Sequence, residues 1–218
     1  MSRGRVISAR GTIRTMSGHL YLLRHGETEW SLSGQHTGRT DIPLTPNGEK
    51  RAADAGRMLA GLRGDNPLAR VMSSPRARAL RTAELAGLSV DDVTEDLAEW
   101  DYGDLEGLTT PKIRETIPGW TVWTHPTPGG ETADLIAMRA ARVLARVKER
   151  LPRGDVVLVG HGHFSRVLVA AWLGMGPTAG VHFALDAAAI AELGDERGVP
   201  QIERLNVPPL PERGFPHV

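Results

Sequence analysis

Apolar residues in this chain fall into short unbroken runs separated by longer stretches with a helical repeat. The runs at residues 19–24 and 155–160 are continuous rather than alternating, a pattern typical of strands buried on both faces of a parallel sheet. A shorter run at 69–72 predicts a third strand, and 187–193 and 201–207 predict two edge strands. These five segments indicate one central sheet.

Helix signals lie between the predicted strands. Thr45 and Pro46 mark a helix start, with a capping side chain and a proline in the first turn, and that helix runs to about Leu62. Ser74 is the expected cap of a second helix through about Leu88, and residues 164–173 predict a final helix. Strands that alternate with helices predict an α/β fold, a three-layer α/β/α sandwich with a mostly parallel sheet.

A longer helix is expected after Gly130, because apolar residues recur there on one face. Four arginines lie off that face and are expected to be exposed to solvent. The apolar positions are Ile136, Ala140, Val143, Leu144, Val147 and Leu151, and the arginines are Arg139, Arg142, Arg146 and Arg150.

Composition narrows the classes of function. The 218 residues include 26 Lys plus Arg and 26 Asp plus Glu, so zero net charge argues against nucleic acid or an anionic membrane as partner. No apolar run approaches the roughly 18 to 20 residues that span a bilayer, and no secretory signal is evident, so we expect a cytoplasmic protein. The absence of cysteine excludes thiol nucleophiles and thiolate metal sites.

The ends of the chain differ from its centre in composition. Residues 1–17 are rich in arginine and are expected to be an unstructured extension, with Met16 as a plausible natural start. Residues 18–207 hold all the predicted elements and form one domain of ordinary size. Residues 208–218 are rich in proline and predict an extended tail.

Two predicted strands end in a histidine followed by glycine. One strand leads into Arg24-His25-Gly26-Glu27 and the other into Gly160-His161-Gly162-His163. Ligands bind beyond the carboxyl ends of strands in open parallel sheets, so both histidines can face one pocket. The glycines allow a ligand to approach the backbone closely.

Five motifs occur together in this order along the chain, and together they resemble the histidine phosphatase superfamily, also called the phosphoglycerate mutase-like family. The resemblance covers nearly all of residues 19–207 and implies a phosphoglycerate mutase-like fold. The motifs are Leu22-Leu23-Arg24-His25-Gly26-Glu27-Thr28-Glu29-Trp30, residues 37–45, residues 73–79, residues 97–107 and Gly129-Gly130-Glu131-Thr132, followed by His161-Gly162-His163.

The resemblance implies a role for each matched residue. His25 is the nucleophile that becomes phosphohistidine, and Arg24, Arg78 and His161 hold the phosphoryl oxygens, a task suited to bidentate guanidinium groups. A leaving alkoxide needs a proton, and Glu99 occupies the motif position of that acid. The remaining matched positions are expected to bind substrate or to orient loops. The residues expected to bind substrate are Ser31 (where the mutases usually carry asparagine), Thr37, Gly38 and Gly162. Glu27 and Glu106 are weaker candidates for the acid and are expected instead to orient loops or to bind backbone groups. Arg166 is expected to be structural, and Arg76 and Arg81 are expected to be exposed.

The resemblance leaves a choice between a phosphatase and a cofactor-dependent phosphoglycerate mutase. Such mutases carry a longer insertion between the acid and the second histidine, with paired arginines for the substrate carboxylate. The segment from Glu99 to His161 is short and has no Arg-Arg pair. The sequence therefore favours a phosphatase for sugar phosphates or similar small phosphomonoesters, similar to the branch of acid phosphatases and sedoheptulose-1,7-bisphosphatases.

Two further classes remain open at this stage. His161 and His163 have the spacing of a two-histidine metal ligand, although the aspartate and the further histidine expected of such sites are missing. A binding domain without activity is the other alternative, disfavoured by the complete set of matched residues. We expect no metal, no cofactor and no partner beyond a small phosphate ester, with a homodimer as the candidate assembly.

Overall fold

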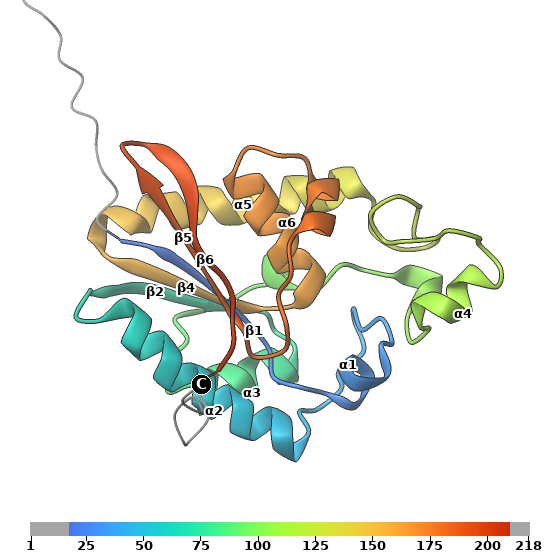
Figure 1. The fold of residues 1–218 in the computed structure, drawn as a ribbon, viewed down its shortest axis with the longest axis horizontal. Helices are drawn as coiled ribbons and strands as arrows, with labels where there is room; N and C mark the ends of the chain where they lie inside the picture. Colours follow the sequence, from blue (N-terminus) through green and yellow to red (C-terminus); the bar gives the residue numbers. More distant parts are fainter. Residues whose placement is uncertain (1–17, 210–218) are drawn as a thin grey trace, which may run out of the picture.

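A computed structural model describes residues 18–209, which form a six-stranded mixed sheet covered by helices (Figure 1). The strand order is β3-β2-β4-β1-β5-β6, with β1 to β4 mutually parallel and β5 and β6 antiparallel to their neighbours. The strands are β1 (Leu20–Arg24), β2 (Leu68–Ser73), β3 (Asp92–Val93), β4 (Asp155–Gly160), β5 (Ile190–Glu196) and β6 (Val199–Val207).

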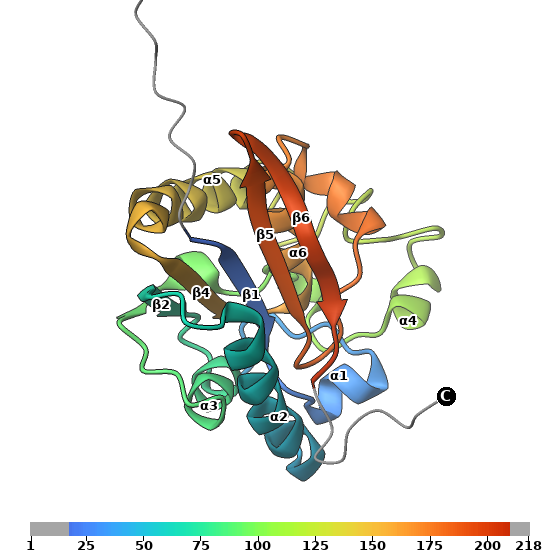
Figure 2. The same ribbon diagram turned by 60° about the vertical axis from the view of Figure 1, so that its left-hand side comes forward.

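Helices cover both faces of the sheet, which gives the three layers expected from the sequence (Figures 1 and 2). One face packs against α5 and α6 and the other against α2 and α3, and each face has its own apolar core. The helices are α1 (Glu29–Ser33), α2 (Pro46–Arg63), α3 (Ala77–Leu85), α4 (Thr110–Arg114), α5 (Ala133–Arg150) and α6 (Gly162–Trp172), with 3-10 turns at η1 (Glu95–Leu97), η2 (Gly103–Leu105), η3 (Leu151–Arg153) and η4 (Pro177–His182).

Alternate residues of the central strands explain the two cores. Leu20 and Leu22 point to the α5 and α6 side, whereas Tyr21 and Leu23 point to the α2 and α3 side. All four are almost completely buried. Successive side chains of a strand face opposite ways, so a strand covered on both faces must be apolar throughout.

Most predicted elements are confirmed. The strand predicted at 187–193 as an edge strand is β5, which lies inside the sheet between β1 and β6. The second helix also differs from the prediction. Ser74 was expected as its cap, but α3 begins at Ala77, and the residue at the N-cap position, Arg76, makes no capping side-chain hydrogen bond. The Asp41 carboxylate instead accepts a hydrogen bond from the Ala77 N–H, at 2.9 Å. Ser74 is thereby available for the contact with His161 described below.

The prediction of a fully solvated arginine face on α5 is wrong at Arg139. The residue is 8% exposed, and its guanidinium forms an ion pair with Glu131 at 2.7 Å. Arg142 lies on the outside of the same helix, as expected, where it pairs with Asp96. Periodicity marks which positions lie off the apolar stripe, but it does not show that another loop covers one of them.

The expected N-terminal extension, residues 1–17, and most of the expected tail, residues 208–218, lie outside the described residues. Within residues 18–209, no helix combines the length and apolar character needed to cross a membrane.

Candidate active site

The two histidines that follow β1 and β4 lie side by side. The strands are adjacent and parallel, with Arg24 paired to Gly160, so the next residue of each strand emerges at the same edge of the sheet. The rings of His25 and His161 meet edge to face with centroids 5.2 Å apart. Their exposed fractions are 5% and 0%, which confines any chemistry to a nearly dry site.

The tautomer of His25 follows from one hydrogen bond. Its Nδ1 lies 2.7 Å from the Gly26 carbonyl oxygen, and a carbonyl can only accept, so Nδ1 carries the proton. Burial, followed by the charges of Arg24 and Arg78, holds the pKa of His25 well below 6.5. The ring is therefore neutral, with the Nε2 lone pair free to attack.

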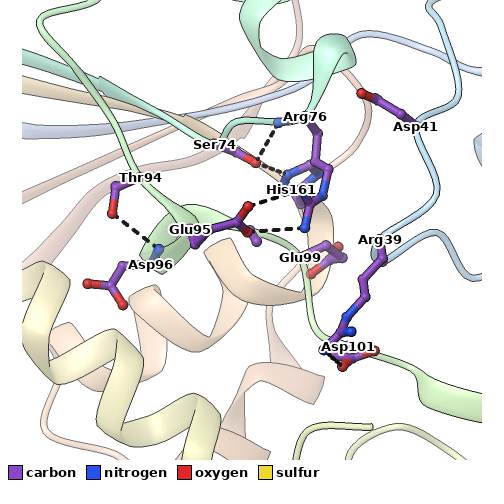
Figure 3. Close-up of polar contacts among 12 residues, drawn as sticks. Arg39, Asp41, Ser74, Arg76, Thr94, Glu95, Asp96, Glu99, Asp101 and His161 are labelled. Carbon is purple, nitrogen blue, oxygen red and sulfur yellow. Dashed lines mark hydrogen bonds and ion pairs between the residues drawn. The ribbon is translucent and has the colours of Figure 1, made fainter.

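His161 is held by Ser74, whose Oγ lies 2.7 Å from His161 Nε2 (Figure 3). Burial, followed by the charge of Arg78, lowers the pKa of His161 well below its ordinary value. His161 Nδ1 is buried and has no hydrogen-bond partner among residues 18–209. When Ser74 donates to Nε2, Nδ1 carries the proton and can donate it in a hydrogen bond to a ligand.

Arg24 and Arg78 bring fixed positive charge to the two rings. One Arg24 terminal nitrogen donates to the Leu185 carbonyl at 2.7 Å. Arg78 is fully buried and donates to the carbonyl oxygens of Thr37, Gly38 and Thr40. Within the described chain, the Nε–H groups of both arginines are buried without a partner, so each arginine keeps at least one donor beyond its structural contacts.

Glu99 lies at the N-terminus of α6, with 8% of its surface exposed. Its Oε1 accepts hydrogen bonds from the backbone N–H groups of Trp100 and Phe164, both at 2.8 Å, and its Oε2 accepts one from His163 at 2.9 Å. Each carboxyl oxygen has two lone-pair sites, so Oε2 keeps one. A proton carried by Glu99 belongs on Oε2.

A cavity of about 170 Å³ lies beside these groups, where β1 leads into His25 and β4 leads into Gly162. Six of the nine predicted site residues line it, namely Arg24, His25, Ser31, Thr37, Glu99 and Gly162. The cavity lining does not include Arg78, His161 or Gly38. Arg78 is nevertheless close enough to His25 and to His161 to lower the pKa of each.

The predicted substrate-binding residues also have structural partners. Ser31 and Thr28 form a reciprocal capping box at the start of α1. The Gly38 N–H donates to both carboxylate oxygens of Glu106 at 2.9 Å, so Gly38 takes part in anchoring its loop. Glu106 also accepts from the Thr40 N–H, and Glu27 accepts from the side chains of Thr45 and Asn47, so both carboxylates bind residues of the segment between α1 and α2 or of the first turn of α2.

The cavity lining includes His36, Tyr102 and His163, which were not predicted as site residues by the sequence. Tyr102 Oη lies 2.6 Å from His163 Nδ1. Burial and the nearby Glu99 charge raise the pKa of Tyr102 well above 10, so its hydroxyl remains a donor. Burial, followed by the Arg166 charge, lowers the pKa of His163, and burial lowers that of His36 to about 4.

The sequence contained only weak signals that Tyr102 and His163 belong to the site. Tyr102 lies three residues after Glu99 in the same motif, and His163 follows His161 by two residues. Arg166, expected to be structural, donates to the carbonyls of Gly180 and Val181 and also lines the cavity.

His161 and His163, the candidate pair of metal ligands, each form a hydrogen bond with a different residue. His161 contacts Ser74 and His163 contacts Tyr102. Across the described part of the chain, no three His, Cys, Asp or Glu side chains are arranged to hold a metal ion.

Comparison with known proteins agrees with this geometry. The family model of the histidine phosphatase superfamily (branch 1) matches residues 20–208. The chain belongs to this superfamily. Histidine phosphatases similar to it include an acid phosphatase of Mycobacterium tuberculosis, 47% identical over 88% of this chain and 94% of that protein.

The chain is also similar to a second named protein and to a solved structure. A sedoheptulose 1,7-bisphosphatase of Saccharomyces cerevisiae is 35% identical over 71% of this chain and 67% of that protein. The solved structure of a Mycobacterium tuberculosis open reading frame superposes with a TM-score of 0.85 at 46% identity, covering 88% of this chain and 98% of that chain.

Proposed function

We propose that this protein is a phosphatase that hydrolyses small phosphomonoesters through a phosphohistidine on His25. The observation that carries the proposal is the neutral His25 ring, protonated on Nδ1, in the same cavity as Glu99. In the first step, Nε2 attacks phosphorus while the bond from phosphorus to the ester oxygen breaks. The departing oxygen takes the proton from Glu99 Oε2.

The second step returns the site to its starting state. A water oxygen attacks phosphorus, the phosphorus–nitrogen bond breaks, and the ionised Glu99 accepts the proton of the water. Arg24, Arg78 and His161 supply donors for the equatorial phosphoryl oxygens in both steps. Preorganised donors of this kind stabilise the transition state strongly because the site excludes water.

Sugar phosphates are the proposed substrates. The relatives include proteins named acid phosphatase and sedoheptulose 1,7-bisphosphatase, and a structural neighbour is described as a mycobacterial glucosyl-3-phosphoglycerate phosphatase, with a TM-score of 0.75 at 28% identity, covering 87% of this chain and 99% of that chain. The cavity wall beyond the histidines carries polar groups, among them Gln35, His36 and His163. Such groups suit a leaving group rich in hydroxyls.

A panel of phosphate esters, with release of inorganic phosphate as readout, tests this proposal. We expect release from sugar phosphates, undiminished in the presence of a chelator and inhibited by vanadate. Interconversion of 2- and 3-phosphoglycerate with negligible phosphate release would instead establish the mutase alternative. Loss of activity in chelator, with recovery on adding a divalent metal, would establish metal-dependent hydrolysis.

We further propose that residues 18–207 form the catalytic domain and that the protein acts in the cytoplasm as a homodimer. Support for self-association comes from Leu135 and Met138 on α5, which are 52% and 59% exposed. Light scattering coupled to gel filtration tests the dimer, and a monomer at micromolar concentration would contradict it.

A further inference from the structure

The loop that carries Glu99 is fixed by a second loop that has no role in the chemistry described above. Residues 127–132, which include the Gly-Gly-Glu motif, pack backbone to backbone against residues 99–104. The Glu131 N–H donates to the Asp101 carbonyl at 2.9 Å and the Asp104 N–H to the Pro128 carbonyl at 2.8 Å. A side-chain carbon on Gly130 would lie 2.3 Å from the Asp101 oxygen, so only glycine fits.

Arg139, which lies on α5, also binds the backbone of Glu99 and of the residues directly before it. Its Nη1 donates to the Asp96 carbonyl at 3.1 Å and the Ala98 carbonyl at 2.6 Å, and its Nη2 donates to the Glu99 carbonyl at 3.3 Å. The other two N–H groups bind both carboxylate oxygens of Glu131, at 2.9 and 2.7 Å. All five guanidinium donors are thereby used.

The same guanidinium also contacts the residue that holds the Glu99 carboxyl. Arg139 Cζ lies 4.0 Å from the centre of the Phe164 ring, and the Phe164 N–H donates to Glu99 Oε1. Arg139 therefore touches the Glu99 backbone on one side and a carboxyl anchor on the other. The Arg139 and Glu131 side chains are only 10% and 14% exposed, so solvent screens the pair weakly.

We propose that the buried Arg139–Glu131 pair positions Glu99 for proton transfer to the leaving group. This inference rests on the proposed role of Glu99 as the acid. A reacting group displaced by about 1 Å loses on the order of 100-fold in rate, and Arg139 fixes three carbonyls within four residues of that group. Lysine cannot replace it, because an ammonium has three donors and no planar fork.

Leaving groups of different basicity separate positioning of the acid from general damage. An alkyl phosphate releases an alkoxide that needs the proton, whereas p-nitrophenyl phosphate releases a phenolate that departs without it. We expect Arg139→Lys to lose on the order of 100-fold in kcat on the alkyl phosphate and less than about tenfold on p-nitrophenyl phosphate. Glu99→Gln should show the same selectivity more strongly, since general acid catalysis contributes on the order of 10²- to 10⁴-fold.

Arg142→Ala is the matched control, because Arg142 binds the side chain of Asp96 from the surface of the same helix and should leave both activities unchanged. Thermal unfolding of each variant is recorded, and activity is measured well below the midpoint. Glu131→Gln keeps the side-chain shape while removing the charge, and it should show the same selectivity with a smaller loss if Arg139→Lys does not fold.

Each outcome has a distinct meaning. Equal losses on both substrates in folded Arg139→Lys or Glu131→Gln, or no loss on either, would overturn the positioning role. If Glu99→Gln loses the same activity on both substrates, Glu99 is not the acid, and the inference about Arg139 fails as well. If the unmodified protein releases no phosphate from either substrate, the proposed function fails instead.

Discussion

His25 and His161 meet edge to face, with ring centroids 5.2 Å apart, although they lie far apart in the sequence.

 Each histidine directly follows its strand, β1 for His25 and β4 for His161, so the pairing of Arg24 with Gly160 brings the two rings together. Neighbouring parallel strands leave the sheet at the same edge. The ring contact is therefore a direct consequence of strand order.

Replacing His25 removes the proposed nucleophile. We expect His25→Ala to lower phosphate release by on the order of 10³-fold or more and to abolish the phosphoenzyme trapped by acid quenching with a radiolabelled substrate. His182→Ala is the control, because His182 is exposed and should keep both signals. Retained turnover in His25→Ala would remove His25 from the nucleophile role.

Removing the Ser74 hydroxyl leaves the buried His161 Nε2 without its partner at 2.7 Å. An unmade hydrogen bond in a buried site costs about 1 to 3 kcal/mol, so we expect kcat/KM of Ser74→Ala to fall by about ten- to one-hundredfold. Ser73→Ala is the matched control, since Ser73 is equally buried and donates to a carbonyl oxygen rather than to His161. Equal losses in the two variants would show that the Ser74 contact has no special role.

Gly162 packs against the Arg24 guanidinium, and a side-chain carbon at position 162 would lie 3.1 Å from Arg24 Cζ. We expect Gly162→Ala to displace this guanidinium, which we propose binds the phosphoryl group, and to lower kcat/KM by on the order of tenfold or more. Gly61→Ala provides the comparison, because that position in α2 has open space around it and should gain about 0.5 to 1 kcal/mol in free energy of unfolding. Unchanged kinetics in Gly162→Ala would contradict the packing argument.

Burial of neutral histidines predicts a loss of stability in acid. Burial lowers the pKa of His36 from 6.5 to about 4, so the unfolded chain binds a proton at a pH where the folded chain does not. The free energy of unfolding therefore decreases as the pH falls from about 6.5 to about 4, by about 3 kcal/mol for this residue.

Chemical denaturation across that pH range measures the effect. The slope should be smaller in His36→Gln than in the unmodified protein and unchanged in His182→Gln, whose histidine is exposed. Part of the slope should remain in His36→Gln, since the pKa values of His25, His161 and His163 are also lowered. An unchanged slope in His36→Gln would contradict the assignment.

Local patterns were sufficient for the layers of the fold and for the two histidines. The continuous apolar runs of β1 and β4 can be stable only between two covered faces, and glycine after each histidine marks the strand end. The start of α3 was predicted wrongly, because serine is a residue type that often caps helices. The Ser74 hydroxyl instead forms a hydrogen bond with His161, 87 positions away.

The sequence by itself determined the features that depend on residues close together in the chain. These features are the buried strands, the amphipathic face of α5, and the motifs that place His25, Glu99 and His161 at the ends of strands or helical turns. Only the tertiary structure decided the burial of Arg139, the contact of Ser74 with His161, and the wall formed by His36, Tyr102 and His163. These contacts join segments 41 to 87 positions apart. Long-range pairing is fixed by the packing of whole layers, and short-range periodicity does not encode it.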